Sequence, residues 1–361
     1  MEYLRLDEVC ELNMGQSPAS DSYNREADGL PFFQGNADFG ETYPVTRVWC
    51  NKPTKIVDKG TLLISVRAPI GALNFATEKS CIGRGLAGIT QKNGYELKYI
   101  YYALKFKHEE LNNKGTGSTF KAISKASLGE ILIKNVSVEI QEECVKKLDL
   151  INKIIVEERE QIKQLDALIK SRFVEMFGDP VQDKKCFNVL PMTEICEIID
   201  GDRGENYPKQ DEFLSDGYCL FLNAKNVTIS GFSFSNCMFI TKEKDAILRN
   251  GRLNRGDVVL TTRGTIGNLA YYDASIPYDN IRINSGMVIL RMKSEIVGEV
   301  FFIEQFKMQL EFIKRKIASG SAQPQLPIST MNKIKMLIPP MELQKQFAAF
   351  VRQIDKLKFI Y

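Results

Sequence analysis

The chain repeats itself, and this duplication constrains the fold more than any other feature. Residues 59–71, KGTLLISVRAPIG, return as RGDVVLTTRGTIG at residues 255–267. Four other segment pairs match in the same order, namely 6–12 with 192–198, 28–38 with 216–227, 114–133 with 318–338, and 138–143 with 341–346. Because the order is kept while the offset grows from 186 to 203 residues, we infer a tandem duplication of one large unit rather than a solenoid. The alternative is two unrelated domains that share strand-turn chemistry.

Each copy contains the same sequence of predicted elements. Short apolar runs bounded by glycine, 62–66 and 258–262, predict strands. Helical spacing of aromatic and aliphatic residues follows at 95–112 and 297–316, and then come a small-residue loop and a further strand. The predicted fold class is therefore α+β, with two similar mixed α/β domains in tandem and a long helix after each.

The helix after each domain carries a seam of apolar residues spaced by three and four. The first seam comprises Leu148, Ile151, Ile155, Ile162, Leu165, Ile169 and Met176, and the second comprises Leu343, Phe347, Val351 and Ile354. Such seams predict an antiparallel coiled coil between the two helices. The predicted boundaries are 1–140 for the first domain, 141–177 for the central helix, 178–340 for the second domain and 341–361 for the C-terminal helix.

Composition narrows the class of protein. The 361 residues suit two domains, no apolar run is long enough to cross a bilayer, and we expect a cytoplasmic protein. Eight cysteines without a C-x-x-C pair predict reduced thiols. The single histidine, His108, excludes two-histidine zinc sites, and we assign it no role. A net charge of +3 means that any DNA-facing surface must be local.

Sequence motifs for catalysis are missing. We find no phosphate-binding G-x-x-x-x-G-K-[ST] loop, no glycine-rich dinucleotide or S-adenosylmethionine turn and no Asn-Pro-Pro-aromatic methyltransferase signature. The DKK run at 183–185 lacks the spaced acidic partners of a nuclease motif. We therefore expect no enzymatic activity, no metal and no cofactor bound by this chain.

Taken together, these features resemble the specificity subunit of type I restriction-modification systems. The resemblance rests on the twin domains, on the strand-Arg-x-x-Ile-Gly turns, on LIKSRFVEMFGDP (168–180) after the heptad helix and on the run 320–344. It implies that each domain is a target recognition domain that reads one half of a split site in double-stranded DNA. The coiled coil would then set the spacer and dock two modification subunits.

The resemblance also places the chemistry on partner subunits. Modification subunits bind S-adenosylmethionine and methylate adenine, and motor-nuclease restriction subunits use ATP and Mg²⁺ to cut unmethylated DNA. Two alternatives remain at the level of sequence. One is a stand-alone DNA methyltransferase or nuclease component, and the other is a coiled-coil scaffold without DNA contact.

Candidate DNA-binding residues fall into three groups. Arg67 and Arg263 recur in both copies, which should read different sequences, so a phosphate or scaffold role is favoured over base readout. Polar residues where the copies diverge are candidates for specificity, namely Gln16, Ser17, Gln34, Asn36, Ser118, Thr119, Lys121, Arg203, Asn206, Lys209, Asn223, Lys225, Gln323 and Gln325. Basic candidates for phosphate contacts are Lys114, Lys125, Arg249, Arg252, Arg255 and Lys316.

One departure from the family concerns the second helix, which has about 20 residues, whereas the two helices of the family are normally similar in length. A shorter helix predicts a weaker coil and weaker docking of one modification subunit. A second copy of the chain could complete the coil as a homodimer.

Overall fold

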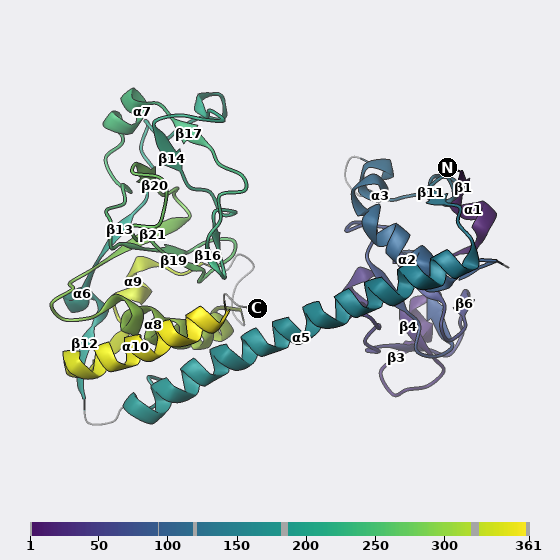
Figure 1. Cartoon of the computed structure of the whole chain (residues 1–361), viewed down its shortest axis with the longest axis horizontal. Coiled ribbons are helices and arrows are strands. Elements are labelled where there is room, and N and C mark those ends of the chain that lie inside the picture. The colour runs from purple at the N-terminus through teal and green to yellow at the C-terminus, as the bar shows by residue number, and fades with distance from the viewer. Residues whose placement is uncertain (1, 93, 118–120, 182–186, 319–324, 359–361) are drawn as a thin grey trace. The chain divides into compact units, whose positions relative to one another are not determined.

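The structure is a computed structural model that describes residues 2–92, 94–117, 121–181, 187–318 and 325–358. The chain divides into two compact units, residues 1–157 and 158–361 (Figure 1). Each unit is described separately below. No helix in the described part of the chain is both long and apolar enough to span a bilayer.

Unit 1 is built on two sheets flanked by helices. The first sheet is antiparallel and has the order β2 (Cys10–Met14), β10 (Leu86–Gln91), β7 (Leu62–Ser65) and β8 (Leu73–Phe75). The second has the order β3 (Tyr23–Asn24), β5 (Trp49–Cys50), β4 (Leu30–Phe33), β9 (Ser80–Ile82) and β6 (Ile56–Val57). In addition, β1 (Tyr3–Arg5) and β11 (Leu132–Lys134) form a separate two-stranded sheet. The helices are α1 (Leu6–Val9), α2 (Leu97–Phe106), α3 (His108–Lys114), α4 (Lys125–Gly129) and the first part of α5 (Val138–Phe177).

Unit 2 has the corresponding arrangement. Its four-stranded sheet has the order β13 (Cys196–Asp200), β21 (Met287–Met292), β18 (Val258–Thr261) and β19 (Leu269–Tyr271). Its smaller sheets are β17 (Phe239–Ile240), β14 (Cys219–Phe221) and β20 (Ile281–Arg282), β15 (Val227–Thr228) with β16 (Gly231–Phe232), and β12 (Asn188–Pro191) with β22 (Lys335–Ile338). The helices are α6 (Met192–Ile195), α7 (Lys242–Ile247), α8 (Glu299–Ala318), α9 (Ile328–Met331), α10 (Met341–Lys358) and the remainder of α5.

The register of the central sheets shows that the two units are copies of one fold. Asn13 of β2 lies opposite Gly88 of β10, and Ile199 of β13 lies opposite Ile289 of β21. Residues of β2 therefore correspond to residues 186 positions later, and residues of β10 correspond to residues 201 positions later. The prediction of two similar mixed domains in tandem is confirmed.

Two buried glutamines show the duplication at the level of hydrogen bonds. The Oε1 atom of Gln141 in α5 accepts a hydrogen bond from the backbone N–H of Glu96, just before α2, at 2.9 Å. The Oε1 atom of Gln344 in α10 accepts one from the backbone N–H of Gly298, just before α8, also at 2.9 Å. Each amide nitrogen donates to backbone carbonyls nearby, so a buried polar side chain fixes the first turn of each long helix.

Within unit 2, the C-terminal part of α5 packs against α10 and α8 (Figure 1). The rings of Phe173 and Phe347 lie 5.4 Å apart, and the carboxylate of Asp166 forms an ion pair with Lys358 at 2.7 Å. Residue numbers thus rise along α5 as they fall along α10, so these two segments run antiparallel. The apolar contact continues through Ile169 and Phe177.

The predicted seam on α5 is covered only in its second half. Ile169 is buried, Ile162, Leu165 and Met176 are half-buried, and the α10 residues Phe347, Val351 and Ile354 are buried. Near the end of the seam, the predicted Met176 packs against the core of unit 2 but is only half-buried, whereas the fully buried positions are Phe173 and Phe177.

The first half of the seam lies in unit 1, where its side chains are exposed. Leu148, Ile151 and Ile155 are 37%, 52% and 41% exposed. These apolar positions are therefore exposed on the part of α5 that belongs to unit 1.

Cys10 and Cys196 occupy equivalent positions in the two units, and their reactivity tests whether the core of each unit is packed as described. Burial raises the pKa of both the Cys10 and the Cys196 thiols to about 12, so both remain protonated at neutral pH. At pH 8 we expect iodoacetamide to modify the half-buried Cys144 and Cys237 well before either. Peptide mass spectrometry of the native chain measures this order, and fast modification of Cys10 would contradict the described core.

Candidate nucleic-acid interface

In unit 1, three loops converge at the ends of β2, β4 and β9, and they bring predicted residues together. Ser17 follows β2, Gln34 follows β4 and Arg84 follows β9. The Oγ atom of Ser17 accepts hydrogen bonds from Gln34 Nε2 at 2.9 Å and from the backbone N–H of Arg84 at 3.2 Å. Gln16 is exposed beside Ser17, and Asn36 is half-buried in the loop after Gln34. We call these three loops the unit 1 loop cluster.

Glycines make this convergence sterically possible. A Cβ atom on Gly15 would lie 2.2 Å from the carbonyl oxygen of Gly83, and one on Gly85 would lie 2.4 Å from that of Gln34. Neither backbone oxygen could give way without opening the cluster. Arg84, between two buried glycines, is exposed, and its guanidinium has no hydrogen-bond or ion-pair partner in the described part of the chain.

The unit 2 loop cluster is built in a similar way where the loops after β13 and β20 meet. A Cβ atom on Gly201 would lie 2.3 Å from the carbonyl oxygen of Asn284. Arg203 donates from Nη2 to the Ser285 carbonyl at 3.3 Å and to the Asp200 carboxylate at 3.0 Å. The tight approach of Gly201 thus repeats that of Gly15, which lies 186 residues earlier.

A cavity of about 310 Å³ adjoins the unit 2 loop cluster and unites three predicted residues. It is lined by Asp200, Arg203, Thr262, Arg263, Val288, Gln325, Leu326, Pro327 and Ile328. Arg203, Arg263 and Gln325 come from segments far apart in the sequence. The backbone of Arg263 pairs with that of Gln325, as the backbone of Arg67 pairs with that of Ala122 in unit 1.

The recurrent arginines, Arg67 and Arg263, are exposed, and their side chains have no hydrogen-bond or ion-pair partner in the described residues. They are therefore available to an anion. Gly71 has a φ of +91°, and a Cβ there would lie 2.9 Å from Nδ1 of His108. Lys314 occupies the same space beside Gly267. These glycines thus leave room for the packing of His108 and Lys314.

The remaining candidates are scattered around these clusters or lie elsewhere. Three of them are exposed lysines, namely Lys121, Lys209 and Lys225. Asn223 is half-buried in its own turn, and Asn206 donates from Nδ2 to the Ile247 carbonyl at 3.5 Å. Lys114 forms an ion pair with Glu130 at 3.3 Å. Ser118, Thr119, Gln323 and the run 183–185 lie outside the described residues, as does the side chain of Lys316.

Two predicted phosphate contacts are engaged inside the fold instead. Arg255 donates to three backbone carbonyls and to Asp279, and its guanidinium lies 4.2 Å from the ring centre of Tyr272. Arg252 forms an ion pair with the buried Asp245 at 3.0 Å. Both arginines brace loops, which favours a structural role over the predicted phosphate contact.

Sequence reasoning missed Arg84. The available signal was the G-R-G triplet at 83–85, in which two glycines flank a cation before an apolar strand. A single triplet of this kind does not show which loops it will meet, because Ser17 and Gln34 are far away in the sequence. Only the tertiary convergence identifies Arg84 as part of the cluster.

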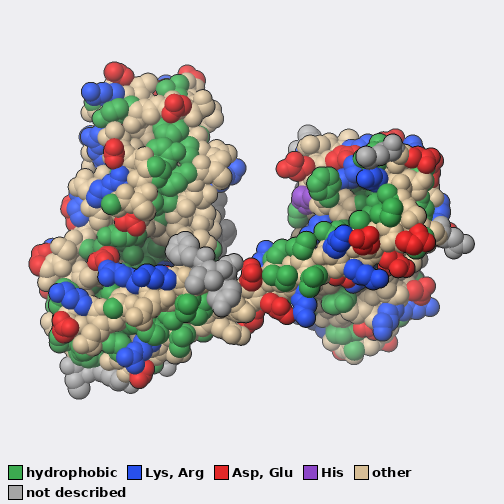
Figure 2. All heavy atoms as spheres, viewed as in Figure 1, with side chains coloured by type: hydrophobic (Ala, Val, Ile, Leu, Met, Phe, Trp, Pro, Cys, Tyr) green, Lys and Arg blue, Asp and Glu red, His purple; other side chains and the backbone are tan. Residues whose placement is uncertain are grey.

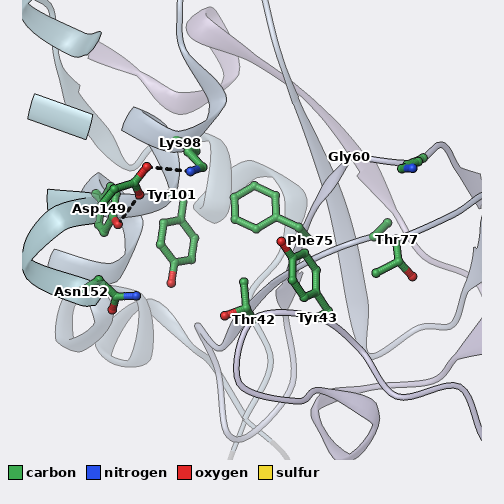
Figure 3. A pocket seen from close by; sticks show the side chains of 12 residues that line it. Thr42, Tyr43, Gly60, Phe75, Thr77, Lys98, Tyr101, Asp149 and Asn152 are labelled. Carbon is green, nitrogen blue, oxygen red and sulfur yellow. Dashed lines mark hydrogen bonds and ion pairs between the residues drawn. The ribbon is translucent and has the colours of Figure 1, made fainter. Parts of the chain in front are cut away.

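A further cavity of unit 1 lies in a different place, and none of the predicted residues lines it (Figure 3). It has a volume of about 570 Å³. Beside it, the carboxylate of Asp149 in α5 accepts hydrogen bonds from Tyr102 and Lys98 of α2, each at 2.7 Å. Burial and the bond to Asp149 raise the pKa of Tyr102 above its ordinary range. The group joins α2 to α5 and supplies no evident catalytic chemistry.

Charge on the visible face of each unit is mixed, with basic and acidic side chains interspersed (Figure 2). The described residues contain no cluster of three or more His, Cys, Asp or Glu side chains that could hold a metal ion. The candidate site of each unit is therefore its polar loop cluster, in which closely packed glycines bring the loops together.

The fold and these clusters define a tandem-repeat protein with one polar loop cluster in each copy. A family model for the type I restriction modification DNA specificity domain matches residues 1–167 and again residues 185–360. The chain belongs to this family.

Related proteins support the same assignment. A putative type I restriction enzyme MjaX specificity subunit of Methanocaldococcus jannaschii is 44% identical over 158 residues, which cover 44% of this chain and 37% of that protein. The MjaIX specificity subunit of the same organism is 23% identical over 318 residues, covering 83% and 72%. This chain thus aligns with little more than a third of the first relative. The crystal structure of a type-I restriction-modification S subunit from M. genitalium, 18% identical, matches the fold with a TM-score of 0.51 over 100% of this chain and 90% of that one.

Proposed function

We propose that the chain is the DNA sequence-specificity subunit of a type I restriction-modification complex. The observation that carries this proposal is the duplicated DNA specificity domain, in which equivalent loops carry different polar residues. A shared platform with divergent side chains suits the reading of two different half-sites in one split DNA site.

The same proposal assigns the chemistry and the assembly to partners. This chain itself is non-catalytic, and S-adenosylmethionine, ATP and Mg²⁺ belong to the modification and restriction subunits. Helices α5 and α10 form a coiled coil that sets the unread spacer and docks the modification subunits. The antiparallel contact between Phe173 and Phe347 supports such pairing over the second half of the predicted seam.

The experiment is a DNA-binding titration of the chain assembled with its modification subunits, repeated at several salt concentrations. A contact with Z phosphates gives a slope of log K against log salt of about −0.9Z. We expect a steep slope and a footprint in two separated segments. A flat slope would favour a scaffold without DNA contact, and methylation or cleavage by the purified chain alone would establish an enzyme.

A further inference from the structure

The two loop clusters differ by an exchange of arginine and serine at two equivalent positions. Position 17 corresponds to 203, because β2 and β13 are offset by 186 residues, and position 84 corresponds to 285, because β10 and β21 are offset by 201. Unit 1 has Ser17 and Arg84, whereas unit 2 has Arg203 and Ser285. Each unit therefore has one arginine and one serine at this pair of positions, on opposite loops.

Contacts confirm that the two positions touch in both units. In unit 1, the backbone N–H of Arg84 donates to Ser17 Oγ at 3.2 Å. In unit 2, Nη2 of Arg203 donates to the Ser285 carbonyl at 3.3 Å. The contact involves the backbone of the arginine in unit 1 and the guanidinium of the arginine in unit 2.

Each guanidinium keeps donors free for a ligand. That of Arg84 has no partner in the described residues. That of Arg203 uses only Nη2 within the same residues, toward Asp200 and Ser285, and its side chain is 48% exposed. A planar guanidinium on a rigid loop matches the two acceptors, O6 and N7, that guanine presents in the major groove.

We propose that Arg84 and Arg203 are the specificity-determining residues of the two units, each reading a guanine of its own half-site. This inference rests on the proposed function. Because the arginines stand on opposite loops, the guanine is read at a different place in each half-site. Arg67 and Arg263, which the units share, belong to the common platform.

The test uses the chain assembled with its modification subunits and a set of DNA duplexes. The wild-type complex first defines its methylation motif, and each base of that motif is then varied. Arg84→Ala should relax one guanine position of the first half-site, where the preference for guanine falls by about 5- to 150-fold. Arg203→Ala should do the same in the second half-site only.

Two further variants and the pattern of binding across the duplexes separate the outcomes. Arg25→Ala removes another exposed arginine of unit 1 and should leave the motif unchanged. Ser17→Arg combined with Arg84→Ser gives unit 1 the arrangement of unit 2, and the guanine preference should move within the first half-site. Uniform weakening across all duplexes by Arg84→Ala, with a smaller salt slope, would show a phosphate contact and overturn the inference. Failure of the wild-type complex to select any DNA motif would instead overturn the proposed function.

Discussion

Asp245→Ala should destabilise unit 2 by about 3–5 kcal/mol, because it leaves a buried guanidinium without its counter-charge. Asp245 and Arg282 form an ion pair at 2.5 Å, and their side chains are 4% and 5% exposed. Arg282 also donates to backbone carbonyls at the end of α7, including that of Leu248 at 3.1 Å. The pair therefore ties α7 to β20, directly beneath the unit 2 loop cluster.

The measurement is calorimetric unfolding of the whole chain. A two-unit chain is expected to unfold in more than one step, so the transition of unit 1 serves as an internal reference. Arg252→Ala is the matched control, since Arg252 binds the same carboxylate from a side chain that is 47% exposed. Because the Arg252 side chain is partly in solvent and Asp245 keeps Arg282 as its buried partner, we expect this change to cost about 0–1 kcal/mol. If both variants cost the same, the buried pair does not hold unit 2 together.

Phe173→Ala should cost unit 2 about 3–5 kcal/mol through the cavity that it opens. Phe173 is fully buried, and its ring centre lies 5.0 Å from that of Phe177 and 5.4 Å from those of Phe301 and Phe347. These rings belong to α5, α8 and α10. The substitution therefore loosens all three helices at once.

Val174→Ala is the matched control for the aromatic cluster. Val174 is the next residue of the same helix and is 38% exposed, so its truncation should change the unfolding of unit 2 by no more than about 0.5 kcal/mol. Urea titration followed by tyrosine fluorescence and circular dichroism would compare the two variants. Equal costs would mean that α5 is not part of the core of unit 2.

Sequence predicted those parts of the fold that depend on local periodicity and on repetition. The strands at 62–66 and 258–262 became β7 and β18, and the helix after Pro340 became α10. The predicted helix at 95–112 is interrupted at Lys107, where a ψ of 19° separates α2 from α3. Boundaries of this kind depend on tertiary packing, which local spacing does not encode.

The seam on α5 shows where periodicity stops being informative. Spacings of three and four residues fit both a track through Arg172 and Met176 and a track through Phe173 and Phe177. The choice depends on which face meets α8 and α10, and those helices lie more than a hundred residues away in the sequence. The actual partners bury the phenylalanines because aromatic rings fill more of the space between three helices.

The sequence predicted only part of the candidate interface, because the contacts that assemble it join residues that are far apart in the chain. Divergence between copies pointed to Ser17, Gln34 and Arg203, and the structure places each in a loop cluster. Arg84 was missed because its partners are distant in the sequence. Arg255 was assigned to DNA because an exposed arginine and one that braces a loop look alike in a sequence.

The modular account is tested most directly by exchanging residues 1–140 for the corresponding domain of another specificity subunit. The hybrid is assembled with its modification subunits in cells, and the methylated motif is read by sequencing modified bases. The account predicts that one half of the motif changes while the other half and the spacer length stay the same. Change in both halves, or in neither, would contradict it.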